Sequence, residues 1–296
     1  MMKLQRLTTR PVMEPIASHG WERAAVFNSA MVYHDGLFHA IYRATDIGGH
    51  EKFGRYINTF GYATSQDLIN WQRQETPILS NDVPQELRGP EDPRIVKIGD
   101  TFYMNYTGFG GRFRNDHRIC MAESKDLLSW ERQGVMLDEP NKDSSFFPEK
   151  FGGRFCMFHR RHPDIWICYS DDLKTWTGHQ KIMSPQAGAW DSDRIGIAGP
   201  PVKIADGWFL IYHGVDDKEV YRLGAVLLDY NDPSKILAKY PEPIIEPELE
   251  WEINGFVPNV IFSCATVLKD DVIYCLYGGA DTVLGIASMK LKDIVF

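Results

Sequence analysis

The chain has 296 residues, and its 40 acidic and 32 basic side chains give a formal net charge of −8. This balance argues against a nucleic-acid-binding protein, whose affinity depends on a surplus of Lys and Arg. Hydrophobic residues make up 44% and charged residues 24%, which is typical of a globular chain and excludes a disordered one, and no run of about 18 apolar residues predicts a membrane span.

The N-terminal stretch MMKLQRLTTRPVMEP lacks the apolar core of a signal peptide, so we expect a cytoplasmic protein. The five cysteines are odd in number and form no CxxC pair, and most lie in apolar segments such as FCMFH and WICYS. We therefore expect buried, reduced thiols rather than disulfides or metal ligands.

A segment rich in aromatic and aliphatic residues recurs five times along the chain. Each copy opens on a Gly or Asp turn signal and continues at strand-like density. The copies are GLFHAIYRA at 36–44, DTFYMNYTG at 100–108, GRFCMFHR at 153–160, DGWFLIYHG at 206–214 and DVIYCLYGG at 271–279. Aligned on Tyr42, Tyr106, His159, Tyr212 and Tyr277, they are spaced by 64, 53, 53 and 65 residues.

A second motif, S-x-D-L-x-x-W, follows the first three copies at a short distance. It reads SQDLINW at 65–71, SKDLLSW at 124–130 and SDDLKTW at 170–176, with a weaker echo, LLDYNDPSKI, at 227–236. These segments are too short for stable exposed helices, so we predict a strand end, a polar turn and a Trp that packs between neighbouring units. After the fifth copy the chain ends in LGIASMKLKDIVF, whose final strand is expected to close the ring.

Five β-rich units of this length predict an all-β fold, a five-bladed β-propeller in which each blade is a four-stranded sheet around a central channel. The units are longer than usual propeller repeats and leave room for functional loops. A β-sandwich is the alternative, but it does not account for a five-fold repeat. We expect residues 1–296 to form a single propeller domain with its active site in a central funnel.

In a propeller the innermost strands line the funnel, so the residues that follow the aligned Tyr and His positions of the five repeats are the first candidates for it. The five copies present Arg43, Thr107, Arg160, His213 and Gly278 there. Two arginines and a histidine are unusual in a structural core, because Arg is rarely buried without a partner. The alternative is a set of solvated strand ends with chance cations.

The densest polar segment is ELRGPEDPRI at 86–95, in which Pro90 and Pro93 bracket Glu91 and Asp92. The prolines stiffen the backbone and fix the directions of the two carboxylates. Neighbouring residues of an extended chain face opposite ways, so only one of the pair should reach the funnel. An ordinary surface turn is the alternative.

Several segments together resemble glycoside hydrolase family 130, which comprises inverting β-mannoside phosphorylases and some β-mannosidases on a five-bladed propeller. The segments, in chain order, are GPEDPR, FPEK, GPP followed by GW and IYHG, and GGAD. The resemblance covers essentially the whole chain and is strongest to bacterial enzymes that act on β-1,2-linked mannobiose and mannooligosaccharides. It implies that Asp92 is the catalytic acid and protonates the glycosidic oxygen through the mannosyl 3-hydroxyl. Phosphate would then attack the opposite face and release α-mannose 1-phosphate.

The resemblance also implies two groups of binding residues. The phosphate-binding group is Lys142, Arg160, Arg194, His213 and Tyr221, with Arg194 standing where many relatives carry Lys. For the mannosyl unit we expect Asn28, Ser29, Arg43, Asp46, Arg88 and Asp281, with Phe27, Phe256 or Tyr106 as an apolar platform. Arg suits phosphate because its planar fork binds two oxygens at once.

Other activities remain open from the sequence. They are a β-1,4-mannosyl phosphorylase, a β-mannosidase that uses water, and a propeller that binds glycans without chemistry. Segments 220–224 and 46–58 are candidates for selecting the acceptor sugar. We expect no cofactor and no metal, since inorganic phosphate is a co-substrate, and as partners a small β-mannoside and phosphate, without nucleic acid or membrane. The resemblance also allows a homo-oligomer such as a dimer.

Overall fold

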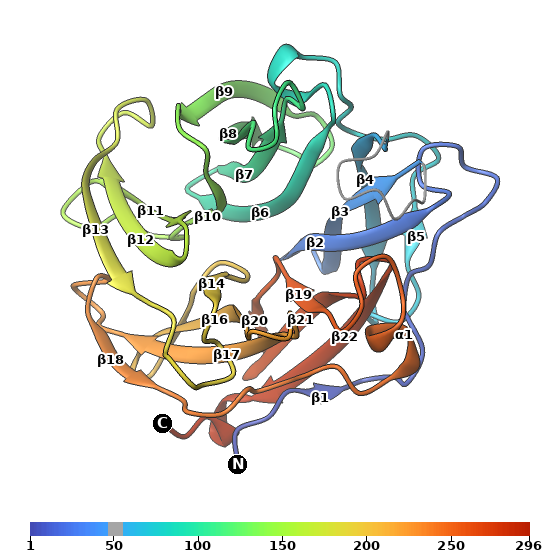
Figure 1. Ribbon diagram of the computed structural model, residues 1–296. Helices are drawn as coiled ribbons and strands as arrows, with labels where there is room; N and C mark the ends of the chain where they lie inside the picture. Colours follow the sequence, from blue (N-terminus) through green and yellow to red (C-terminus); the bar gives the residue numbers. More distant parts are fainter. Residues whose placement is uncertain (47–55) are drawn as a thin grey trace.

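The strands form five antiparallel sheets arranged as the blades of a β-propeller, in a computed structural model that describes residues 1–46 and 56–296 (Figure 1). The predicted fold class is therefore confirmed. The first three blades are β2 (Ala25–His34), β3 (Leu37–Thr45), β4 (Asn58–Ser65) and β5 (Gln72–Arg73); β6 (Pro90–Ile98), β7 (Thr101–Phe109), β8 (His117–Ser124) and β9 (Glu131–Leu137); and β10 (Lys142–Phe146), β11 (Phe155–Arg161), β12 (Asp164–Ser170) and β13 (Thr177–Met183).

The fourth and fifth blades each contain a split inner edge. Their strands are β14 (Arg194–Ile197), β15 (Val202–Ile204), β16 (Gly207–Val215), β17 (Tyr221–Leu228) and β18 (Ile236–Lys239); and β19 (Ile261–Ser263), β20 (Val267–Lys269), β21 (Val272–Gly279), β22 (Val283–Lys290) and β1 (Gln5–Arg6). The short helix α1 (Glu250–Ile253) precedes the fifth blade, and 3₁₀ turns lie at Pro84–Glu86 and Leu291–Asp293.

The ring is closed by the N-terminus rather than by the last strand alone. Strand β22 lies within the fifth sheet, and β1 pairs antiparallel with its outer side, with Gln5 opposite Ser288 and Arg6 opposite Ala287. The two chain ends consequently lie close together at the rim (Figure 1). The expectation that the C-terminal strand closes the ring is corrected accordingly.

The repeated aromatic segments form the second strand of each blade, not the innermost one. They correspond to β3, β7, β11, β16 and β21, while β2, β6, β10, β14 and β19 stand next to the central axis. Second strands carry the strongest hydrophobic signal because sheets pack against them on both faces. The side chains that face the axis therefore come mainly from the less regular innermost strands, with additions from the ends of their neighbours.

The S-x-D-L-x-x-W segments form the turn that leads to the outermost strand. In the first blade the Ser65 hydroxyl accepts the backbone N–H of Leu68 at 2.9 Å, and Asp67 accepts the N–H groups of Ile69 and Asn70. Leu68 adopts a left-handed φ of 67°, and the Trp71 indole N–H donates to its carbonyl. The same arrangement recurs in the second blade.

Among the described residues the core comprises five large hydrophobic clusters, each located between adjacent blades, and one small cluster around β19. Side chains of β3 and β4, for example, pack against side chains of β7 and β8, with Phe60 and Tyr106 ring centroids 5.8 Å apart. The motif tryptophans Trp71, Trp130 and Trp176 each pack on the cluster shared with the preceding blade, as predicted. All five cysteines are buried and unpaired, which confirms the expectation of reduced thiols.

Four blades share a buried Tyr–carboxylate–cation triad, built on the Tyr at the aligned position of the repeated aromatic segment. In the second blade the Tyr106 hydroxyl donates to Glu86 at 2.6 Å, and Arg132 of the outermost strand lies 3.1 Å from the same carboxylate. The equivalent triads are Tyr42–Glu22–Arg73, Tyr212–Asp191–Lys239 and Tyr277–Glu252–Arg6. Each triad ties the outermost strand of a blade to the segment that enters that blade.

We expect Arg6→Ala to lower the free energy of unfolding by about 3 kcal/mol, since removing one partner leaves the fully buried Glu252 carboxylate without its cation. The loss lies at the low end of the usual range because Tyr277 and two backbone N–H groups still donate to Glu252. Urea unfolding curves measure the change. Arg10→Ala, at an exposed position, is the matched control. Equal stability of the two variants would contradict a stabilising role for the Arg6–Glu252 ion pair.

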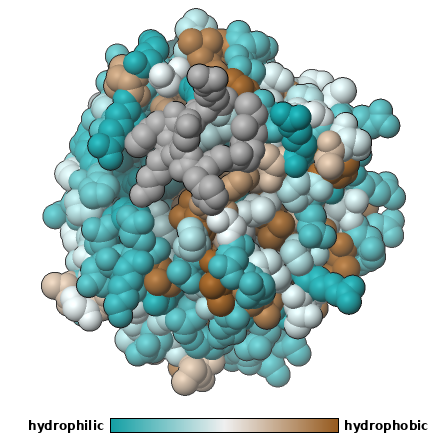
Figure 2. Space-filling model, turned by 45° about the vertical axis from the view of Figure 1, so that its right-hand side comes forward, coloured by the Kyte–Doolittle hydropathy of each residue, from teal (hydrophilic) through white to brown (hydrophobic). Residues whose placement is uncertain are grey.

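The surface is predominantly hydrophilic on the face shown in Figure 2, with hydrophobic residues scattered among polar ones. Isolated exposed apolar residues of this kind are normal for a folded domain. Among the described residues, no helix is long and apolar enough to cross a membrane.

Candidate active site

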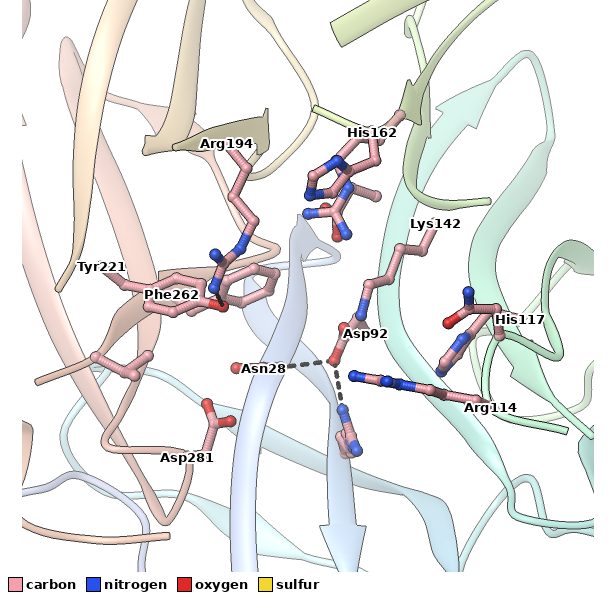
Figure 3. Close-up of a pocket in the computed structure, with 15 residues that line it drawn as sticks. Asn28, Asp92, Arg114, His117, Lys142, His162, Arg194, Tyr221, Phe262 and Asp281 are labelled. Atoms are coloured by element: carbon pink, nitrogen blue, oxygen red, sulfur yellow. Dashed lines mark hydrogen bonds and ion pairs between the residues drawn. The ribbon is translucent and has the colours of Figure 1, made fainter. Parts of the chain in front are cut away.

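A polar cavity of about 470 Å³ lies on the axis of the ring, at the end where the innermost strands begin (Figure 3). All five blades contribute to it, through β2, β6, β10, β14 and β19 and through the adjoining ends of second and third strands. Its size falls within the range of small-molecule sites. The predicted residues that line it are Asn28, Arg43, Asp92, Lys142, Arg160, Arg194, Tyr221 and Asp281.

Asp92 is held at a bulge near the start of β6. The register shifts between Glu91 and Arg94, and Asp92 has a left-handed φ of 54°, a conformation that Asp tolerates better than most residues but that is rare before a proline. Its Oδ1 accepts hydrogen bonds from Asn28 Nδ2 at 2.8 Å and from Arg43 Nη1 at 3.1 Å. Backbone outliers of this kind gather at functional sites.

Asp92 lines the cavity and Glu91 does not, so the expected division between the two carboxylates is confirmed. Its Oε1 accepts from Arg43 Nη2 at 2.8 Å and from Asn58 Nδ2 at 3.0 Å. Burial raises the pKa of Glu91 despite the neighbouring Arg43 charge. Burial acts in the same direction on Asp92, but the charges of Arg43, Lys142 and Arg94 outweigh it and hold its pKa below the usual range.

Asp281 lines the same cavity from the turn after β21, and its left-handed φ of 51° aims its carboxylate at the centre (Figure 3). Burial is the main reason that its pKa rises to about 6, with the negative charges of Asp92 and Glu91 adding to it and Arg43 opposing it. His117 lies across the cavity, stacked on Phe109 at 4.3 Å. Burial and the cations Lys142 and Arg43 lower its pKa to about 3, so its ring is neutral.

Three cations and a phenol line the cavity, with Arg194 and Tyr221 on one side and Lys142 on the other (Figure 3). Arg194 Nη2 donates to the Tyr221 hydroxyl at 2.7 Å, and Arg160 Nη1 lies 2.7 Å from the Asp143 carboxylate. Lys142 stands opposite Arg160 in the β10–β11 register and extends towards Asp92 (Figure 3). A group of donors that converge on one space is suited to an anion with several oxygens.

Four predicted residues do not line the cavity. His213 is fully buried, with its ring 4.5 Å from that of Phe262 and its Nε2 3.4 Å from Asp143. The buried Ser29 hydroxyl donates to backbone carbonyl oxygens, the Asp46 carboxylate accepts the N–H of Ile57, and the Arg88 guanidinium lies 5.5 Å from the Tyr56 ring. Their direct contacts with substrate stay predictions. Residues 47–55 of the candidate acceptor loop lie outside the described residues.

Several lining residues escaped the sequence analysis. They are Arg114, Asn115, His117, Asp143, His162, Val260 and Phe262. Phe262 supplies the aromatic surface, whereas the proposed platform Tyr106 is a core residue bound to Glu86. The strand register shows what the sequence did not, namely that Asp143 lies at the same bulge position in its blade that Asp92 occupies in the second.

We expect Asp281→Asn to raise the free energy of unfolding by about 1–2 kcal/mol at pH 7.5 and to reduce turnover. Functional residues commonly lower stability in this way in exchange for activity. The folded-state pKa of about 6 exceeds the usual 3.8, so ionisation of Asp281 costs stability as the pH rises from about 4 to 6, and the full penalty persists above. Urea unfolding at pH 4.5 and 7.5 measures it. A gain of equal size at both pH values would contradict this explanation.

One cluster in the described residues has the composition of a metal site, namely His159, Cys168 and His179 in the third blade. Asn141 Oδ1 accepts the backbone N–H of Arg160, so its Nδ2 donates to His159 Nδ1 at 3.0 Å. His159 must then carry its proton on Nε2, which donates to His179 Nδ1 at 3.1 Å. A ligating imidazole needs an acceptor behind it, not a donor, so the cluster fits a structural hydrogen-bond chain better than a metal.

The propeller and its carboxylate-and-cation cavity define a carbohydrate-active protein of the glycoside hydrolase type, and the comparisons with known proteins agree. Residues 3–296 match the model of Glyco_hydro_130, described as beta-1,4-mannooligosaccharide phosphorylase. The chain belongs to glycoside hydrolase family 130, as the sequence motifs indicated.

Similar proteins of this family include two from Thermoanaerobacter sp. (strain X514). The chain is 61% identical over 296 residues to a 1,2-beta-oligomannan phosphorylase and 51% identical over 303 residues to a beta-1,2-mannobiose phosphorylase, with full coverage of both chains in each case. The solved structure of a beta-1,2-mannobiose phosphorylase from Listeria innocua in complex with beta-1,2-mannobiose has a TM-score of 0.89 at 26% identity, covering 99% of this chain and 98% of that one.

Proposed function

We propose that the protein is an inverting phosphorylase that cleaves β-1,2-mannobiose or short β-1,2-mannooligosaccharides with inorganic phosphate. The products are α-mannose 1-phosphate and mannose or a shortened chain, and the reaction is reversible. The observation that carries this proposal is one cavity that contains the buried carboxylate Asp92 together with Lys142, Arg160 and Arg194. The two full-length relatives named for β-1,2-linked substrates support the linkage.

The cations have a clear purpose in phosphorolysis. A phosphate nucleophile already carries negative charge, so it needs donors that bind and orient it rather than a base that activates it. In the proposed complex Lys142 and the guanidinium groups of Arg160 and Arg194 hold the phosphate oxygens, and the Tyr221 hydroxyl keeps Arg194 in place. Alignment of phosphate with the anomeric carbon then supplies much of the rate enhancement.

Asp92 acts as the acid only in the loaded site. In the free protein Arg43, Lys142 and Arg94 keep its pKa low and the group ionised. A phosphate dianion beside Lys142 offsets part of that positive charge and raises the pKa of Asp92, which then holds the proton. Asp92 passes this proton to the glycosidic oxygen through the mannosyl 3-hydroxyl, while Asn28, Arg43 and Asp281 bind the mannosyl unit.

A β-mannosidase is the second candidate because the cavity contains Asp281. A carboxylate with a pKa of about 6 is a suitable base for activating water in an inverting hydrolase. Hydrolysis, however, gives no role to Lys142, Arg160 and Arg194. A β-1,4-linked substrate is the other alternative, in line with the description of the family model. A glycan-binding propeller without activity would have no use for the acid.

The test is incubation of the purified protein with β-1,2-mannobiose, with and without inorganic phosphate, while mannose 1-phosphate and free mannose are quantified. We expect equal amounts of both products with phosphate and no reaction without it. Mannose released without phosphate would establish a hydrolase instead. Activity confined to β-1,4-mannobiose or β-1,4-mannosylglucose, assayed in parallel, would overturn the linkage.

We propose inorganic phosphate as the co-substrate and no further cofactor or metal, because the acid and the cations supply the required chemistry. A cytoplasmic location and a homo-oligomeric state stay predictions. Fractionation of cells and light scattering of the purified protein test them.

A further inference from the structure

Three blades place an equivalent residue at the axis by the same backbone device. Asn28, Asp92 and Asp143 have φ values of 46°, 54° and 55°, and each lies where the register between the first and second strand of its blade shifts. All three line the central cavity. Asn28 and Asp92 bind each other, whereas Asp143 lies among the cations.

Asp143 receives positive or polar groups from three different blades. Arg160 Nη1 of its own blade lies 2.7 Å from Oδ2, His213 Nε2 of the fourth blade lies 3.4 Å from the same oxygen, and Arg94 Nη2 of the second blade lies 3.5 Å from Oδ1. Burial raises the pKa of Asp143, but the Arg160, His213 and Arg94 groups outweigh burial and bring the pKa well below its usual range. The carboxylate is therefore a fixed negative charge.

Arg94 is itself immobile, which makes the cluster rigid. Only 1% of it is exposed, and its guanidinium donates to the carbonyl oxygens of Ala198 at 2.6 Å, Ile197 at 2.9 Å and Asp92 at 3.1 Å. One arginine thus connects the backbone of the proposed acid, the fourth blade and Asp143. The position of the Asp143 carboxylate is set by the fold, not by solvent.

A fixed carboxylate has two opposite effects on an anion in the cavity. Its charge repels phosphate, so its removal alone would tighten phosphate binding. Its contact with Nη1 also restricts the long Arg160 side chain to one orientation, with the remaining donors left for a ligand. Fixing such a side chain before binding removes an ordering cost equivalent to up to about tenfold in affinity and aligns its donors.

We propose that Asp143 is the positioning residue of the phosphate site: it holds Arg160, supported from behind by Arg94 and His213, in the orientation that binds phosphate. This rests on the proposed function and deepens it, since it gives Asp143 the role of holding the phosphate-binding side chain Arg160. The gain from orienting Arg160 outweighs the repulsion between Asp143 and phosphate, because Arg160 contacts the anion directly and Asp143 acts through Arg160.

The test is Asp143→Asn, assayed by calorimetric titration with inorganic phosphate and by steady-state kinetics. Asn28 occupies the equivalent left-handed position, so the backbone accepts Asn there. We expect the phosphate Kd and KM to rise about tenfold and kcat to fall, with the mannobiose KM nearly unchanged. A phosphate Kd that is unchanged or lower would overturn the proposal, because Asp143 would then only balance the positive charge of its neighbours and would not orient Arg160 for phosphate.

A double-mutant cycle and two further variants complete the test. In an Arg160→Ala background, Asp143→Asn should change phosphate binding less than about twofold, and a full tenfold additional loss would contradict action through Arg160. Glu22→Gln, in a buried ion pair outside the cavity, should alter stability but not phosphate binding. If Asp143→Asn does not fold, Asp143→Glu retains the charge and displaces the carboxylate, and wild-type phosphate affinity in it would overturn positioning.

Direct titration separates this proposal from the proposed function. A wild-type protein that binds phosphate but releases no mannose 1-phosphate would overturn the phosphorylase, while the effect of Asp143→Asn on phosphate binding would still decide the role of Asp143. A wild-type protein that does not bind phosphate would overturn both.

Discussion

Asp92→Asn is expected to reduce the turnover of β-1,2-mannobiose by about 10³-fold or more while the melting temperature stays close to that of the wild type. General acid catalysis contributes factors of about 10²–10⁴, and the variant removes the only proton that Asp92 can deliver. The amide oxygen can still accept from Asn28 and Arg43, which preserves the local structure. Initial rates and thermal unfolding of both proteins measure the two quantities.

The leaving group distinguishes an acid from a residue that only binds sugar. The 2,4-dinitrophenolate group of an activated aryl mannoside, 2,4-dinitrophenyl β-mannoside, departs without protonation. Asp92→Asn should therefore retain a much larger share of the wild-type rate on this substrate. Equal losses on both substrates would show that Asp92 binds the mannosyl unit or organises the site. A variant that keeps most of its rate on mannobiose would refute the assignment of the acid.

Arg160→Ala is expected to lower kcat/KM for phosphate by about 100-fold or more, because a hydrogen bond to a charged group is worth about 1.5–3 kcal/mol and an arginine fork makes up to two of them. The variant also leaves the buried Asp143 without its nearest cation, which adds repulsion against phosphate. Kinetics with varied phosphate at saturating mannobiose, and the reverse, separate the two substrates.

Arg161→Ala is the matched control, since it removes the same side chain from the next position of β11. Arg161 pairs with Glu139 at 2.8 Å and lies over the Trp166 ring, away from the cavity. We expect wild-type phosphate kinetics in this variant. A similar loss in both variants would indicate a general effect on the third blade, and a loss confined to the mannobiose KM in Arg160→Ala would place Arg160 at the sugar instead.

The number and type of blades could be predicted from the sequence because each second strand is packed on both faces and repeats a strong hydrophobic pattern. The position of those strands within a blade could not, since innermost strands carry polar, bulged segments such as Phe27–Ala30, and β10, β14 and β19 have only 5, 4 and 3 residues. Ring closure by β1 was also missed. Two residues, Gln5 and Arg6, give no periodic signal, and their pairing with β22 depends on contacts far along the chain.

The proposed acid and cations were accessible through family motifs, whereas the residues that organise them were not. Asp143 and Arg94 act across blades, and no spacing along the chain reveals which carboxylate meets which guanidinium. His213 is a related case, because its motif predicts a phosphate ligand, and the fold also places its Nε2 3.4 Å from Asp143. Direct contact and support from behind look alike in a sequence.

The pairing of β1 with β22 has a consequence for biosynthesis. The first four blades are built from consecutive strands and can form as they leave the ribosome, but Arg6 must wait for Glu252 and Ala287, which are made last. Closing a loop of this length is entropically costly and slow. Until it closes, β22 presents an unpaired edge to other nascent chains, a recognised route to aggregation. Pairing of Gln5 and Arg6 with β22 thus covers a strand edge that would otherwise be available to other chains.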